Sequence, residues 1–200
     1  MILSEEHVWP TIVSSVIAAG AALSGIAVGS WFTARNQQRE RRNARVREQL
    51  QGFYSPMLGM RSEIGTKSHI RNKVSSATGA EYVEQFAGVS EPEHKAMIER
   101  DMWPLFERVP LYNDEQLRNE IIPLYRKMLD HFSKNLWLAE PSTQEFYPQF
   151  CEFVEIWNRF LAGSMPRGVV ERLDHSEATL KPFYQDLLST FERLRKSFAG

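Results

Sequence analysis

The chain has 200 residues, of which 42% are hydrophobic and 24% charged, and this composition predicts one domain plus an appendage. The net charge of -1 conceals three blocks, because residues 1–34 carry -2, residues 35–73 carry +7 and the remainder carries -6. The single cysteine, Cys151, excludes an intramolecular disulfide framework and is typical of a reducing compartment, and the aromatic run around it indicates a core position.

The N-terminal segment predicts a membrane anchor. Residues 8–34 contain no charged side chain, and about 20 apolar helical residues are enough to cross a bilayer. The acidic N-terminus and the length of the uncharged run argue against a cleaved secretory signal. We therefore expect a short extracytoplasmic N-terminus at 1–8, a transmembrane helix at 9–34, a basic juxtamembrane helix or linker at 35–55 and a cytoplasmic helical bundle at 56–198.

Six arginines follow the uncharged segment and predict its orientation. Positive charge beside a membrane span is retained on the cytoplasmic side, so we expect a single-pass protein with its N-terminus outside and its C-terminal domain in the cytoplasm. At the membrane surface these side chains attract anionic lipid headgroups. An RNA-binding arm is the less favoured interpretation, since the following domain is acidic. The cluster consists of Arg35, Arg39, Arg41, Arg42, Arg45 and Arg47.

Small side chains recur at helical spacing within the predicted span. Such a face allows two membrane helices to approach closely, so it predicts a homo-oligomer or a partner helix. The predicted association face consists of Ser14, Ala18, Ala22, Gly25 and Gly29.

The same steps of three and four residues continue beyond the span and predict a seam like that of a coiled coil. The seam comprises Asn36, Asn43, Val46, Leu50 and Phe53, and a buried asparagine in such a seam specifies register and oligomer state. The alternative is that the segment beyond Leu50 packs into the chain's own bundle, and for that part we prefer the alternative.

The remainder of the sequence predicts an irregular antiparallel bundle of helices. Apolar periodicity and capping patterns indicate helices at 57–76, 91–108, 114–138, 143–162 and 175–198. Expected breaks include Gly79, the Val109-Pro110 pair and the stretch from Gly163 to Gly168, and expected helix starts include Asn113 and Ser142. Prolines inside this region predict kinks or helix restarts.

Candidate chemistry is sparse. Two acid–histidine pairs, Asp130-His131 and Asp174-His175, could with Glu177 supply metal ligands or a general base. Adjacent helical residues point in different directions, so we prefer structural roles for both pairs. We found no motif of a known hydrolase, nucleotide-binding or metal site, and we expect no enzymatic activity, metal or cofactor.

Three runs of the sequence stand out together: LQGFYSPMLGMRSEI, NLWLAEPSTQEFYPQFCEFVEIWNRFL and LDHSEATLKPFYQDLLSTFERLR. They resemble an uncharacterised family of small membrane-anchored helical proteins from microbes and fungi. The family has no assigned activity, so the resemblance implies a coherent helical domain and no site residues.

Two functions are consistent with these features. The first is a membrane-tethered interaction or scaffold protein that self-associates and binds an unidentified cytoplasmic protein. The second is a homo-oligomeric channel, or an effector that perturbs membranes, gated by the cytoplasmic bundle. The first is favoured because the uncharged segment contains no acid or base to mark an ion path. Nucleic acid is an unlikely partner on this interpretation.

Overall fold

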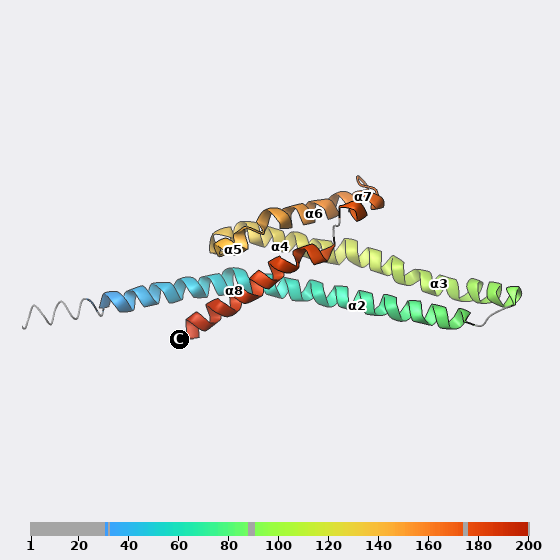
Figure 1. Ribbon diagram of the computed structural model, residues 1–200, viewed down its shortest axis with the longest axis horizontal. Coiled ribbons are helices and arrows are strands. Elements are labelled where there is room, and N and C mark those ends of the chain that lie inside the picture. Colours follow the sequence, from blue (N-terminus) through green and yellow to red (C-terminus); the bar gives the residue numbers. More distant parts are fainter. Residues whose placement is uncertain (1–30, 32, 88–90, 174–175, 200) are drawn as a thin grey trace, which may run out of the picture. The chain divides into compact units, whose positions relative to one another are not determined.

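The computed structural model describes residue 31 and residues 33–87, 91–173 and 176–199, and every regular element within these ranges is helical (Figure 1). The predicted all-α class is therefore confirmed. The chain forms two compact units, Met1–Arg47 and Glu48–Gly200. Among the described residues, no helix is long and apolar enough to cross a membrane. The predicted span at 9–34 lies outside the described residues except for positions 31, 33 and 34.

The described part of the first unit is helical over residues 33–47. All six arginines of the basic cluster are exposed on this helix, as are Asn36 and Asn43, whereas Val46 is buried. The guanidinium of Arg35 lies over the ring of Trp31, 5.2 Å from its centre. This helix therefore presents positive charge to its surroundings.

The second unit is built of α-helices of very different length, from four residues in α5 to 32 in α2. Helix α2 packs against α3, α4 and α8, and α4 packs against α6; α2 and α3 lie side by side (Figure 1). In chain order the elements are η2 (Leu50–Tyr54), α2 (Ser55–Phe86), α3 (Pro92–Gln116), η3 (Leu117–Ile121), α4 (Ile122–Lys134), η4 (Leu136–Leu138), α5 (Pro141–Gln144), α6 (Tyr147–Leu161), α7 (Arg167–Arg172), η5 (Glu177–Leu180) and α8 (Lys181–Ala199).

Two π-helical turns, η2 and η3, each end two residues before a proline, Pro56 or Pro123. A proline has no backbone donor, and its ring crowds the carbonyl four residues earlier. In the wider turn the bonding shifts by one residue, because the N–H of Ser55 donates to the carbonyl of Leu50 and that of Ile122 to the carbonyl of Leu117. The helical path thus continues through both prolines, in agreement with the irregularity that the prolines predict.

Several predicted boundaries were wrong. Helix α2 continues through Gly79 to Phe86, and α3 continues through Pro104 and Pro110 to Gln116. Glycine costs about 1 kcal/mol in a helix and a proline removes one hydrogen bond, and the packing of α2 along α3 outweighs these local losses. Asn113 lies inside α3 instead of starting a helix.

Other breaks are where the sequence indicates them. Gly163 follows α6 with a φ of 72°, a conformation that suits glycine. The helix predicted to start after Ser142 is divided into α5 and α6, with Pro148 as the second residue of α6. A proline is tolerated there because the first turn of a helix leaves its N–H groups unbonded.

Aromatic side chains form the centre of the core in the second unit. Phe132 of α4 stacks on Phe183 of α8, with ring centres 5.6 Å apart and planes 4° apart. Phe150 of α6 lies 5.3 Å from Phe183, and all three rings are fully buried. These contacts join α4, α6 and α8, and this framework positions the polar groups described next.

Candidate functional site

A chain of buried hydroxyl groups links three distant parts of the second unit. The Tyr54 hydroxyl lies 2.9 Å from Oγ1 of Thr143, and Thr143 donates to Oδ2 of Asp186 at 2.6 Å. The backbone N–H of Glu140 donates to the Tyr54 hydroxyl at 2.9 Å. Tyr54 and Thr143 are both completely buried.

The direction of these hydrogen bonds follows from the number of protons. The Thr143 hydroxyl has one proton, which it gives to Asp186, so toward Tyr54 it acts as an acceptor. Tyr54 is therefore the donor to Thr143 and the acceptor from the Glu140 N–H. Burial raises the pKa of the Tyr54 hydroxyl, and this keeps the donor protonated.

Gln49, the residue directly before η2, extends this hydrogen-bond network. Its amide nitrogen donates to the Leu138 carbonyl at 3.0 Å and to Oε1 of Glu140 at 2.8 Å. The other oxygen of Glu140 lies 3.4 Å from a guanidinium nitrogen of Arg193. The network thus ties the start of the unit to the segment between α4 and α5 and to α8, and its full set of partners indicates a structural role.

A second polar cluster joins α2, α4, η5 and α8. The guanidinium of Arg61 lies 4.0 Å above the ring of Tyr184 and 3.3 Å from the Glu177 carboxylate. The Tyr184 hydroxyl donates to the Tyr125 hydroxyl at 3.3 Å. These contacts join four helical elements, and the positive charge of Arg61 offsets the negative charge of Glu177, whose buried Oε1 accepts no hydrogen bond among the described residues.

The buried tyrosines of this cluster predict a loss of stability in alkali. Burial raises the pKa of Tyr125 and of Tyr184 far above the value of an exposed tyrosine, about 10. The folded chain keeps both protons above that pH while the unfolded chain releases them, so stability is complete below about pH 10 and falls as the pH rises further. The fall should be about 1.4 kcal/mol per pH unit for each tyrosine.

Urea denaturation between pH 8 and 11 measures this slope, and the Tyr125→Phe variant should show a shallower loss because one titrating group is gone. Tyr112, which is 61% exposed, provides the matched control, and Tyr112→Phe should leave the slope unchanged. Equal slopes for wild type and Tyr125→Phe would refute the assignment.

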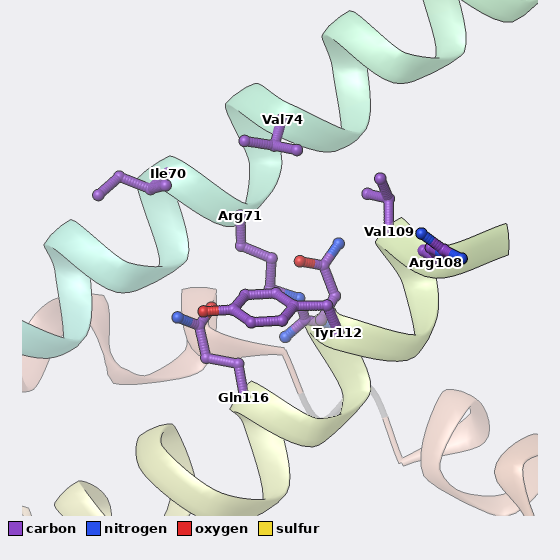
Figure 2. A pocket seen from close by; sticks show the side chains of 8 residues that line it. Ile70, Arg71, Val74, Arg108, Val109, Tyr112 and Gln116 are labelled. Carbon is purple, nitrogen blue, oxygen red and sulfur yellow. The ribbon is translucent and has the colours of Figure 1, made fainter. Parts of the chain in front are cut away.

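Among the described residues, Arg71 of α2 borders three hollows. The first, of about 320 Å³, lies between α2 and α3 and is lined on its apolar part by Ile70, Val74, Val109 and Tyr112. Figure 2 shows Arg71 and Tyr112 projecting from these two helices into the space between them. A second hollow, of about 350 Å³, extends from Arg71 to α6 and α7, and a third of about 120 Å³ reaches toward η5.

Charged groups are unevenly distributed around these hollows. The first is bordered by two arginines, Arg71 and Arg108, and by no acidic residue. Asp114 borders the second hollow and Glu177 the third. In the described part of the chain, no hydrogen bond or ion pair joins Arg71 to either carboxylate. Arg71 is thus a half-buried cation without a structural partner there, in contrast to Arg61 and Arg193.

Of the two predicted acid–histidine pairs, only Asp130-His131 lies within the described residues, and it does not form a site. Asp130 pairs with Lys134 at 2.7 Å, while the ring of His131 stacks on Phe53 at 6.2 Å. Asp174 and His175 lie outside the described residues. Within the described ranges, no three acidic, histidine or cysteine side chains are close enough to hold a metal ion. Cys151 is half-buried on α6.

The predicted association sites are placed as follows. The small-residue face, Ser14 to Gly29, lies outside the described residues. In the predicted seam, Leu50 is half-buried, and Phe53 is fully buried against Tyr54 and Phe132 of its own chain. A seam between two chains cannot include Phe53 while this packing persists.

Sequence reasoning missed the hollow between α2 and α3 and both polar clusters. In the sequence, Arg71 is one of ten basic residues of a charged block and Tyr112 belongs to no motif. The one available signal was that Ile70, Val74, Val109 and Tyr112 recur at helical spacing on two neighbouring helices, a pattern that is also found in any packed pair. A comparison of the chain with protein-family models, with curated proteins and with solved structures finds no match.

Proposed function

We propose that the chain is a membrane-anchored helical interaction protein, which self-associates through its N-terminal segment and binds a cytoplasmic protein through the second unit. One observation carries the proposal: the uncharged residues 8–34 are followed directly by a helix whose six arginines are all exposed. Exposed arginines beside an apolar span suit a membrane surface with anionic lipids. The stacking of Arg35 on Trp31 supports this interpretation, because tryptophan favours the interface.

Membrane fractionation of the full chain tests the anchor. Wild-type protein should stay with the membranes after an alkaline carbonate wash, whereas a variant with both Ile17→Asp and Leu23→Asp should be released. A charged residue at the centre of a span costs about 2.5–3.5 kcal/mol. The matched control, Ile17→Leu with Leu23→Ile, keeps the apolar character and should behave as wild type. Release of the wild-type protein by the wash would contradict the anchor.

Cysteine cross-linking in the same membranes tests self-association. Single cysteines at Gly25 or Gly29, in a Cys151→Ser background, should give disulfide-linked dimers on oxidation because small residues allow close approach of two helices. A cysteine at Ile26 in that background, which lies off this face, should cross-link less. Failure of both glycine positions to cross-link would exclude this face as the contact.

Exposed apolar side chains on α2 and α3 support binding of a protein partner. Val83, Trp103 and Leu111 are 66%, 52% and 57% exposed, and large apolar side chains left on a surface offer area that a partner can bury. Affinity purification of the full chain from its membranes should recover a partner, and Trp103→Ser should reduce its recovery while Val169→Ser on α7 should not. Recovery of the chain alone would remove this part of the proposal.

A further inference from the structure

We propose that the hollow between α2 and α3 binds a single-tailed amphiphile with an anionic head, of the fatty-acid class. The head group would lie on Arg71, and the tail would lie among Val74, Val109 and Tyr112. This inference is independent of the anchor and of any protein partner, since it rests on the second unit alone.

The charged residues around the hollow determine the sign of the charge that a ligand must carry. Arg71 and Arg108 both border it, and none of its lining residues is acidic. Two acids border the neighbouring hollows, and neither pairs with Arg71. Glu177 forms an ion pair with Arg61, and no hydrogen bond or ion pair joins Arg71 to Asp114 among the described residues. A guanidinium donates two parallel hydrogen bonds to a carboxylate, so an anionic head fits Arg71.

The walls of the hollow determine the rest of the ligand. Ile70, Val74 and Tyr112 are 52%, 43% and 61% exposed although they line it. Burial of exposed apolar surface yields about 25 cal/mol per Å², so a hydrocarbon tail that covers these side chains would be favoured. Asn113 is already engaged by donating to Ser75 Oγ at 2.9 Å, so it offers little additional recognition. The site therefore selects a ligand that has a negative charge at one end and is apolar at the other.

The size of the hollow favours a small molecule over a protein segment. Its volume of about 320 Å³ lies at the lower end of the range for small-molecule sites, roughly 300–1,000 Å³. A stable protein interface buries about 800 Å² on each partner, far more than one hollow between two helices provides. We therefore assign a medium-chain fatty acid to the hollow. Occupation by a second copy of the chain or by a partner helix is the alternative that the experiment must exclude.

Photo-cross-linking of the full chain in zwitterionic lipid nanodiscs tests the assignment. The probe is decanoate with a diazirine at the end of its tail. Labelling should be found by mass spectrometry on the peptides that contain Val74, Val109 or Tyr112. Excess decanoate should abolish it, and decanol, which has the same tail without charge, should not.

Variants of Arg71 separate binding from general partition into the bilayer. Arg71→Gln should reduce labelling about tenfold or more, because a hydrogen bond to a charged group contributes about 1.5–3 kcal/mol, and Arg71→Lys should retain part of it. Arg42→Gln, an equal change of charge on the exposed helix, should have no effect. Since Arg71 has no partner among the described residues, the melting temperature of Arg71→Gln should match that of wild type.

The outcomes are distinct. Equal labelling of Arg71→Gln and wild type, or equal competition by decanol, would overturn the proposal. Chain-to-chain disulfides from a Val74→Cys variant in the Cys151→Ser background, together with an absence of probe labelling, would assign the hollow to a second copy instead. Replacing part of the nanodisc lipid with phosphatidylglycerol tests the single tail: labelling should persist, and its loss would assign the hollow to a two-chain bilayer lipid and overturn the proposal.

Discussion

Replacing Phe183 with alanine should lower the free energy of unfolding by about 3–5 kcal/mol. The ring is fully buried, stacks on Phe132 and lies 5.8 Å from Phe146 and 5.3 Å from Phe150. Its removal would leave a cavity between α4, α6 and α8 that rigid neighbouring rings cannot fill. Urea denaturation followed by circular dichroism measures the change.

Leu188 provides the control on the same helix. Its side chain is 51% exposed, and substitution of an exposed residue typically changes stability by less than about 0.5 kcal/mol. Leu188→Ala should therefore have little effect on the denaturation midpoint. If the two variants lost stability equally, the face of α8 that packs into the core would be assigned incorrectly.

The helical class was predictable because it depends on local periodicity. On α8, Phe183, Leu187 and Leu194 recur at helical spacing and are all buried as that spacing indicates. The spacing of apolar residues involves only a few neighbouring positions, so it can be recognised in a single sequence. Prolines predicted irregularity only in part: π-helical turns precede Pro56 and Pro123, whereas α3 continues through Pro104 and Pro110.

Helix ends were less predictable because they depend on tertiary contacts. Asn113 has the composition of a helix start, yet its amide lies inside α3 and donates to Ser75 of α2. An asparagine favours a cap only when its side chain has no better partner. The partner here is 38 residues away in sequence, and no local pattern indicates that distance.

The hollow at Arg71 was unpredictable for the same reason. Arg71, Tyr112 and Trp157 belong to α2, α3 and α6, and only the packing of these helices brings their side chains to one region. A single arginine on a helix is most often solvated, so its presence in the sequence does not indicate a binding site. What distinguishes Arg71 is that it has no hydrogen-bond or ion-pair partner among the described residues, and this can be seen only in the folded chain.

Replacing Tyr54 with phenylalanine should lower the free energy of unfolding by about 2–4 kcal/mol even though the ring is retained. The change removes one hydroxyl that accepts from the Glu140 N–H and donates to Thr143. Both groups would be left without that partner, and a buried polar group without a hydrogen bond costs about 1–3 kcal/mol. Tyr112→Phe removes an exposed hydroxyl and should leave stability unchanged.

A double-mutant cycle tests whether Tyr54 and Thr143 are coupled within the chain of hydroxyl groups. Thr143→Val removes both the donor to Asp186 and the acceptor from Tyr54. Once the Tyr54 hydroxyl is gone, the loss of that acceptor no longer matters, so the two substitutions together should cost less than the sum of each alone. Coupling of about 0.5–3 kcal/mol is typical of residues in direct contact. Strictly additive effects would mean that Tyr54 and Thr143 act separately, and the ordered path from Glu140 to Asp186 would not exist.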